Sequence, residues 1–256
     1  MSGLVSCRVE AGIARVAIDN PPRFNAMSRG MWCDLRHVFE SLNQQTALVA
    51  VLVEGEGGHF CAGGDISEYP GFRFDQAQLR SFHEDEVWGG LQAVLDCDIP
   101  VVAAIRGNCM GAGVEIASAC DVRLATEGAR FGAPIARLGF PMAPREAQLV
   151  GRAVGDLTAR EMLLCAAVLT ASEMKDRGFL NRVVPEDDLG HDIERLLKGM
   201  AQLSPLAARR NKQTLRALAA GAPMEALLAR AYDYAAHPEH REGVSAFMEK
   251  RPPSFR

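Results

Sequence analysis

Two uninterrupted apolar runs constrain the fold of this chain more than any other feature. Leu48–Val53 and Ile99–Ile105 are short, rich in β-branched residues and free of charged positions. A strand with one wet face alternates polar and apolar side chains, whereas continuous runs are typical of strands covered on both faces in a parallel sheet. After Ser28, a fair N-cap, a helical stripe at steps of four, three and four runs from Met31 to Leu42. The sequence therefore predicts an α/β fold.

The remaining pattern divides the chain into two regions. Alternating residues on both sides of Ala11-Gly12 predict a β-hairpin at the N-terminus. We expect a helix over 75–97 and a short strand over 121–125. From about residue 145 helical patterns dominate, over 145–154, 156–166, 186–202, 204–220, 223–236 and 238–249. This order predicts an α/β body followed by a helical C-terminal region.

The composition narrows the classes of function. The 256 residues are 48% hydrophobic and 23% charged, which is typical of a globular protein. The net charge of −4 argues against nucleic-acid binding, despite a short basic stretch at Arg209–Lys212. No apolar run approaches the roughly 18 residues that cross a bilayer, and Met1–Glu10 does not resemble a secretory leader. We expect a cytoplasmic protein with neither a membrane nor a nucleic acid as partner.

Cysteine and histidine spacings favour neither disulfides nor a metal site. The seven cysteines are an odd number and contain no CxxC, so we expect reduced thiols, most of them buried. The only neighbouring histidines, His237 and His240, flank Pro238 and are typical of a solvated helix start. No metal ligands are predicted.

Two segments of small residues follow the buried strands and are the candidates for chemistry. Phe60–Asp65 and Gly107–Glu115 are both rich in glycine and alanine, which let a ligand approach the backbone. Small residues that open a helix leave free N–H groups, and two such turns facing each other would form an oxyanion hole. Glu115 lies one helical turn into the second segment, among apolar neighbours, where it could carry a proton. The alternative is that these glycines serve turn geometry alone.

Other glycine-rich motifs do not fit. The glycines from Gly55 onward would put Phe60 in the last position of GxGxxG, which excludes a dinucleotide fingerprint there. The chain contains neither a GxxxxGK[ST] phosphate loop nor a GxSxG nucleophile elbow.

At these residues the chain resembles the crotonase superfamily, also called the enoyl-CoA hydratase/isomerase family. The similarity runs nearly from end to end and includes the FCAG-type loop, the NGxxxGGGxE-type segment and C-terminal signatures. The residues that carry it are Pro22–Met27, Phe60–Asp65, Gly107–Asp121, Leu203–Ala207 and Phe247–Arg251.

The resemblance implies a crotonase-like spiral of ββα turns, here expected over 1–200, and a helical trimerisation region over 201–256. It implies homotrimers or homohexamers, and an acyl-CoA thioester as substrate, with coenzyme A entering only as part of that substrate and no other cofactor. The backbone N–H groups of Gly64 and Ala112 would form the oxyanion hole, and Glu115 would be the catalytic acid–base group. The resemblance also assigns coenzyme A binding to Arg23, Ala62, Asp65, Ile66, Phe247 and Lys250, the last two possibly from a neighbouring subunit.

The chain departs from the family pattern at the second catalytic glutamate. Family hydratases carry it after the proline of a Phe-Gly-x-Pro-Glu segment, but this chain has Ile135 there. Our hypothesis is that Glu146 or Arg145, at the start of the next helix, reaches the pocket and replaces part of the missing function; the alternative for Glu146 is a helix-start residue favoured by the dipole. The charged run His83–Glu86 lies in a helix that can border the acyl pocket in this family, but we expect it to form a solvated face.

The expected activity is hydration or double-bond isomerisation of an enoyl-CoA, through a thioester enolate. Because one carboxylate is missing, decarboxylation, C–C hydrolysis or thioester hydrolysis on the same fold stay open as alternatives. A non-catalytic acyl-CoA-binding paralogue is a further alternative, which Ile135 favours and Glu115 opposes.

Overall fold

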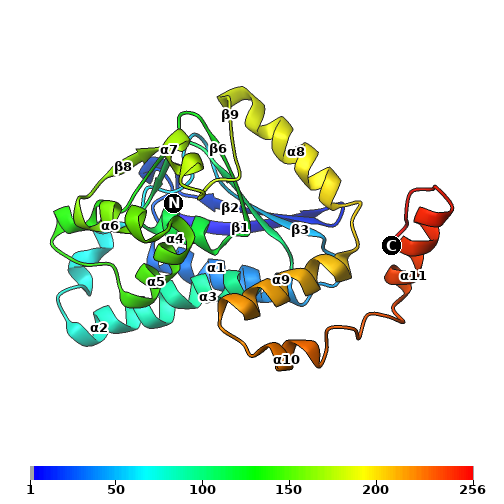
Figure 1. Cartoon of the computed structure of the whole chain (residues 1–256). Coiled ribbons are helices and arrows are strands. Elements are labelled where there is room, and N and C mark those ends of the chain that lie inside the picture. The colour runs from blue at the N-terminus through cyan, green and yellow to red at the C-terminus, as the bar shows by residue number, and fades with distance from the viewer. Residues whose placement is uncertain (1–2, 256) are drawn as a thin grey trace.

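The computed structural model describes residues 3–255 and centres on a six-stranded sheet with the strand order β1-β2-β3-β4-β6-β9 (Figure 1). All neighbours in this sheet are parallel except the antiparallel pair β1 and β2. The strands are β1 (Leu4–Glu10), β2 (Ile13–Asp19), β3 (Ala50–Gly55), β4 (Val101–Ile105), β6 (Val122–Thr126) and β9 (Arg182–Val184). The predicted α/β class is confirmed.

The N-terminal hairpin forms where the sequence predicts it. Ala11 and Gly12 both have positive φ values, 49° and 79°, as the tight turns that match the twist of a hairpin require. β2 then pairs with β3, so the hairpin extends the parallel sheet at its edge.

Both faces of the sheet are covered, which explains the continuous apolar runs. Val51 and Val53 pack into a core with α1 (Arg29–Asn43), α3 (Trp88–Asp96) and α4 (Ala112–Ala119). Ala50 and Leu52 face the other side, where α8 (Leu189–Met200) lies across the sheet (Figure 1). Ser28 caps α1 as predicted, since its hydroxyl accepts a hydrogen bond from the Met31 N–H.

A smaller three-stranded sheet carries the loops of the candidate site. Its order is β5-β7-β8, with β5 (Asn108–Met110), β7 (Arg130–Gly132) and β8 (Val168–Thr170). The region from 66 to 97 forms η2 (Ile66–Gly71), α2 (Gln76–Ser81) and the π-helix η3 (Phe82–Val87) before α3. The remaining elements are η1 (Pro21–Arg23), η4 (Pro134–Leu138), α5 (Pro144–Val154), α6 (Asp156–Leu164), α7 (Ala171–Asp176), η5 (Glu186–Asp188), α9 (Pro205–Ala219), α10 (Met224–Leu228) and α11 (Pro238–Met248).

The C-terminal helices differ in how they meet the body. α9 is fixed to it by side chains: Lys212 donates to the Ile99 carbonyl at 2.9 Å, and Arg216 pairs with Asp98 at 2.7 Å. α10 and α11 extend away from the body (Figure 1). The helix predicted over 223–236 is wrong beyond Leu228, where turns follow, because no side chain in that stretch is buried against another element. In the part of the chain that the structure describes, no helix has the length and apolar character to cross a membrane.

Candidate active site

The two small-residue segments lie side by side, joined by backbone hydrogen bonds. The Cys61 N–H donates to the Asn108 carbonyl at 2.9 Å, and the Met110 N–H donates to the Cys61 carbonyl at 2.9 Å. Cys61 and Cys109 therefore form a parallel bridge, and both side chains are fully buried. The loop after β3 and the start of α4 are fixed against each other at this point.

A third segment fixes the far end of the first loop. Asn25, buried and with φ 61°, donates to the carbonyls of Glu56 and His59 at 2.8 and 2.7 Å. Two residues later, the Met27 N–H donates to the Gly63 carbonyl, and the Met27 carbonyl accepts from the Asp65 N–H, both at 2.8 Å. The Gly63 carbonyl and the Asp65 N–H both face Met27, and Gly64 lies between these two residues in the chain. The N–H of Gly64 therefore points away from Met27.

The backbone N–H groups of Gly64 and Ala112 are among those left free at this junction in the described residues. Ala112 is the first residue of α4, after Gly111, whose positive φ of 47° turns the chain into the helix. The first N–H groups of a helix have no partner within it. Within residues 3–255, the N–H groups of Gly64 and Ala112 have no hydrogen-bond acceptor, and both residues line the same cavity.

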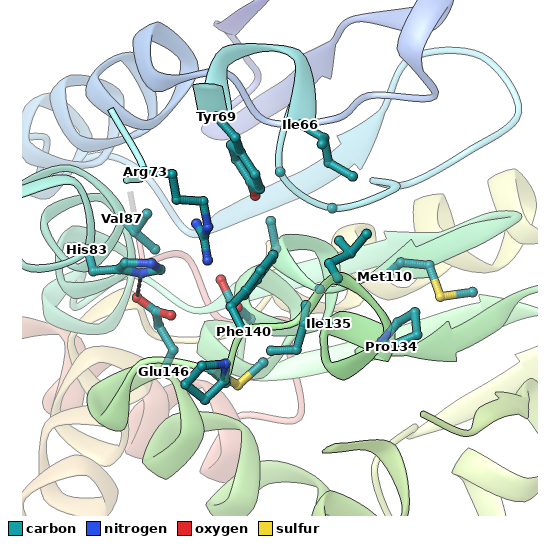
Figure 2. A pocket seen from close by; sticks show the side chains of 18 of the residues that line it. Ile66, Tyr69, Arg73, His83, Val87, Met110, Pro134, Ile135, Phe140 and Glu146 are labelled. Carbon is teal, nitrogen blue, oxygen red and sulfur yellow. Dashed lines mark hydrogen bonds and ion pairs between the residues drawn. The ribbon is translucent and has the colours of Figure 1, made fainter. Parts of the chain in front are cut away.

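The cavity has a volume of about 310 Å³ and a mostly apolar wall (Figure 2). One side is formed by η2 and η3, the other by the segment from Pro134 to the first turn of α5. The carboxyl groups in its wall are those of Glu115 and Glu146. Its lining also includes Trp32, Ala62, Gly63, Ile66, Tyr69, Arg73, Phe82, His83, Val87, Met110, Pro134, Ile135, Phe140, Pro141 and Met142. In the described residues, no group of three or more His, Cys, Asp or Glu side chains is arranged to hold a metal ion.

Glu115 lies in the first turn of α4, three residues after Ala112. Its side chain is buried with 7% exposure among the apolar residues of that helix. Burial raises the pKa of Glu115 well above its usual range, and the negative charge of Glu146 raises it further. Because the two carboxyl groups interact, they titrate as a pair, and both causes favour the neutral form of Glu115.

Glu146 enters the cavity from the first turn of α5 and is 2% exposed. Its Oε1 lies 2.9 Å from Nδ1 of His83, which comes from the π-helix η3 on the opposite wall (Figure 2). Negative charge is favoured at a helix N-terminus, so both the helix and the histidine stabilise the carboxylate. Arg145 points elsewhere and pairs with Glu84 at 3.0 Å. Of the two candidates at this helix start, the structure places Glu146 in the cavity and Arg145 outside it.

The expected solvated face over His83–Glu86 is wrong at two positions. His83 lines the cavity, and the Glu86 carboxylate accepts hydrogen bonds from the Arg29 guanidinium. A π-turn is wider than an α-turn and shifts which side chains share a face, and such turns are frequent at functional sites. The sequence pattern carries no signal for this turn.

The polar and aromatic residues of η2 and the loop before α5 were not predicted. Tyr69 and Phe140 stack edge to face, with ring centroids 6.0 Å apart, and the guanidinium of Arg73 lies over both rings. The Tyr69 hydroxyl contacts the position where a side chain on Gly64 would be. Ile135, in the place of the expected second glutamate, lines the cavity beside them (Figure 2).

The residues assigned to coenzyme A by resemblance fall into three places. Ala62 and Ile66 line the cavity. Arg23 and Asp65 form an ion pair next to it; burial alone would raise the pKa of Asp65, but hydrogen bonds from Ser67 and Arg23 hold it below its usual value. Phe247, 83% exposed, and Lys250 lie at the end of α11, away from the cavity within the chain (Figure 1).

Comparison with known proteins gives one consistent result. Residues 8–256 match the family model described as enoyl-CoA hydratase/isomerase. The chain is 32% identical to the 2,3-dehydroadipyl-CoA hydratase of Escherichia coli, over 100% of this chain and 99% of that protein. It is 28% identical to the short-chain-enoyl-CoA hydratase of Clostridium acetobutylicum, over 94% of this chain and 93% of that protein. A crystal structure described as an enoyl-CoA hydratase/carnithine racemase from Magnetospirillum magneticum superposes with a TM-score of 0.96 at 32% identity, over 100% of this chain and 96% of that one.

Proposed function

Because the chain belongs to the enoyl-CoA hydratase/isomerase family, we propose that it hydrates the double bond of a 2-enoyl-CoA thioester. One observation supports this reaction above the others. Two buried carboxyl groups, Glu115 and Glu146, share a cavity with two free backbone N–H groups. The reaction requires no cofactor beyond the coenzyme A that the substrate carries.

The free N–H groups of Gly64 and Ala112 would bind the thioester oxygen. Addition of water at Cβ moves charge onto this oxygen, and two fixed donors stabilise the resulting enolate. The backbone bonds around Cys61 and Met27 hold the donors in place before the substrate arrives. Loss of one such donor costs about 100- to 1,000-fold in rate in related chemistry.

The carboxyl pair can supply both proton transfers of hydration. The ionised carboxylate takes a proton from water while the water oxygen bonds to Cβ. The protonated carboxyl group gives its proton to Cα. The pair therefore starts and ends with one proton, and one water molecule has been added across the double bond. Burial and the charge of Glu146 favour the neutral form of Glu115, while Nδ1 of His83 lies 2.9 Å from Oε1 of Glu146.

Double-bond isomerisation is the second candidate, and Ile135 favours it. Moving a double bond needs a single group that removes a proton from one carbon and returns it two carbons away, so Glu115 alone could suffice. Hydration needs a second carboxyl group. Because position 135 is an isoleucine, Glu146 would have to act as that group. The two reactions therefore make different demands on Glu146.

We would test this with crotonyl-CoA, following the loss of its conjugated thioester absorbance, and with a 3-enoyl-CoA, following the gain of that absorbance. If the protein is a hydratase, Glu115→Gln and Glu146→Gln each lower crotonyl-CoA turnover by about 100- to 10,000-fold. Glu84→Gln, an exposed glutamate of the same π-helix as His83, is the matched control.

The outcomes separate the candidates. If Glu146→Gln leaves the conversion of the 3-enoyl-CoA intact while Glu115→Gln abolishes it, the enzyme is an isomerase. If the wild-type protein converts neither thioester, hydration and isomerisation are both rejected, and decarboxylation, hydrolysis or binding without catalysis come next.

We also propose that the active form is a homotrimer or homohexamer. Phe247 and Lys250 lie at and just beyond the end of α11, away from the cavity of their own chain (Figure 1), and α11 exposes Val244, Phe247 and Met248. A second copy would bury this apolar surface. Light scattering at several protein concentrations tests this directly, and a monomer at all of them rejects the assembly.

A further inference from the structure

Arg73 is a cation in the wall of the cavity that the proposed reaction does not use. It follows η2, where its N–H donates to the Tyr69 carbonyl at 2.9 Å. The guanidinium carbon lies 3.6 Å from the centroid of the Phe140 ring and 4.5 Å from that of Tyr69. Aromatic faces attract a cation and fix its position, but they leave the N–H groups at the edge of the guanidinium without acceptors.

Among the described residues, no carboxylate forms an ion pair with this guanidinium. Within residues 3–255, Arg73 forms no ion pair, and its side chain donates no hydrogen bond. Burial lowers the pKa of Arg73, with the Tyr69 hydroxyl and Glu146 opposing this shift, so the cation has lost part of its water without gaining a carboxylate. A partly desolvated guanidinium with free donors is suited to a planar carboxylate, which it can bind through two parallel hydrogen bonds.

The place of Arg73 indicates which part of a substrate would meet it. In Figure 2, Ile66, Met110 and Pro134 lie on one side of Tyr69, whereas Arg73, His83 and Val87 lie on the other. Coenzyme A is expected along Ile66, and the thioester oxygen at Gly64 and Ala112. The side of the cavity with Arg73 is therefore where the acyl chain ends.

We propose that Arg73 binds a carboxylate at the far end of the acyl chain, so that the preferred substrate is the coenzyme A thioester of a dicarboxylic acid. This inference rests on the proposed function, because it takes the cavity to be an acyl-CoA site. It assigns Arg73 a role in substrate selection rather than in the proton transfers.

Three charged or titratable residues in the cavity wall agree with this role. The Glu146 carboxylate is near enough to influence the guanidinium but hydrogen-bonds to His83 instead. The Tyr69 hydroxyl is neutral at ordinary pH, since burial raises its pKa. Arg137, the other arginine of the cavity wall, is exposed and donates to the Ala166 carbonyl at 3.4 Å.

The test compares matched pairs of saturated thioesters, which bind without reacting. Calorimetry gives the Kd of adipoyl-CoA and hexanoyl-CoA, of suberoyl-CoA and octanoyl-CoA, and of free coenzyme A. Each pair has the same number of carbons and differs in the terminal carboxylate. For each pair we compare the Kd of the thioester that carries the terminal carboxylate with the Kd of the thioester that lacks it. We expect Arg73→Gln to raise the ratio of the first Kd to the second by about 10- to 100-fold for at least one pair. Arg73→Lys should raise it less, since a lysine keeps the charge but not the paired donors.

Two control variants locate the effect. Arg80→Gln removes an exposed arginine of α2 outside the cavity wall and should leave the ratio as in wild type. If Arg137→Gln, rather than Arg73→Gln, changes the ratio, the assignment to Arg73 is wrong. If Arg73→Gln raises the Kd of both thioesters of each pair and of free coenzyme A by the same factor, the guanidinium binds the phosphates of coenzyme A. The proposal is then overturned.

An unchanged ratio for both pairs also overturns the proposal. Because these ligands do not react, the result holds even if the protein fails to hydrate crotonyl-CoA. Failure of the reaction and failure of the substrate assignment are thus observed in separate experiments.

Discussion

Gly113→Ala tests whether the contact between the two loops controls both stability and activity. Gly113 is buried in α4, and a Cβ added there would lie 2.6 Å from the Cys61 carbonyl oxygen and 3.1 Å from the Cys61 Cβ. Ordinary contacts begin near 3.4 Å, so α4 and the first loop would have to separate by about 0.8 Å. The bridge between Cys61 and Cys109 opposes this movement, because its two hydrogen bonds join the same segments.

The expected cost follows from two opposing terms. Alanine is favoured over glycine inside a helix by about 1 kcal/mol. Overpacking of a rigid site costs about 1–3 kcal/mol, and here the obstacle is backbone, which cannot rotate away. Gly151→Ala in α5 is the matched control, since nothing lies within 4 Å of its added Cβ and only the helix term applies.

Thermal unfolding of the two variants at one protein concentration measures the difference. In a chain of this size, a change of 1 kcal/mol in stability shifts the Tm by about 2–4 °C. Gly151→Ala should therefore raise the Tm by a few degrees, and the Tm of Gly113→Ala should lie roughly 2–12 °C below that of Gly151→Ala. Because the same movement displaces the N–H of Ala112 from that of Gly64, Gly113→Ala should also lose most of its crotonyl-CoA turnover. Equal Tm shifts for the two variants would refute the steric argument.

Two further predictions concern charge. Burial and then the Glu146 charge raise the pKa of Glu115, so the folded state holds a proton that the unfolded state has released, and stability is lost as pH rises above the ordinary carboxyl range. Glu115→Gln should therefore raise the free energy of unfolding by about 1 kcal/mol or more near pH 8, and by much less near pH 4, in urea titrations at both pH values; an equal gain at both would contradict this reasoning. The pKa of Asp65 is lowered on balance, because the hydrogen bonds from Ser67 and Arg23 outweigh its burial, so its contribution is present at neutral pH and is lost as pH falls. Asp65→Asn should lower the free energy of unfolding by up to about 1 kcal/mol at neutral pH and by less in acid, and a loss that grows in acid would rule out this account.

The sheet could be predicted from the sequence because its signals are local. The run from Leu48 is apolar at every position because one set of side chains packs on α1 and α3 and the alternate set on α8. The hairpin turn at Ala11 and Gly12 is equally local. By contrast, β8, α7 and β9 were not predicted, since elements of three to six residues carry too few positions for a periodic pattern.

The helix over 223–236 shows the opposite failure. Its composition is rich in alanine and leucine, which favour a helix, but propensity alone rarely holds a short helix without a buried face. Only Met224–Leu228 is helical, and none of the side chains in the segment is buried within the chain. The proposed assembly supplies a partner for this region, and the boundary at residue 200 between body and C-terminal helices stays a prediction.

Part of the candidate site could be predicted because it depends on motifs within single segments. Gly64, Ala112 and Glu115 belong to two such segments, and the structure brings them to one cavity. Arg73 was not predicted, and the run with His83 was expected to be a solvated face, because Arg73 follows a 3-10 helix and His83 lies in a π-helix, which leave no periodic trace in the sequence. Only side-chain geometry shows that Arg73 has no carboxylate partner in the described chain.

In the proposed hydratase, Glu146 would supply the second carboxylate from a new position on the same fold. At position 135 a glutamate would follow β7, on a short 3-10 turn; at position 146 it stands in the first turn of α5, where the helix itself favours negative charge. A buried carboxylate also needs a hydrogen-bond donor, and the π-helix turns His83 toward it from the opposite wall. Under the proposed function, Ile135, the glutamate on α5 and the wide turn at His83 form one arrangement, and changing His83 to asparagine should weaken hydration through Glu146 while leaving the N–H groups of the loops in place.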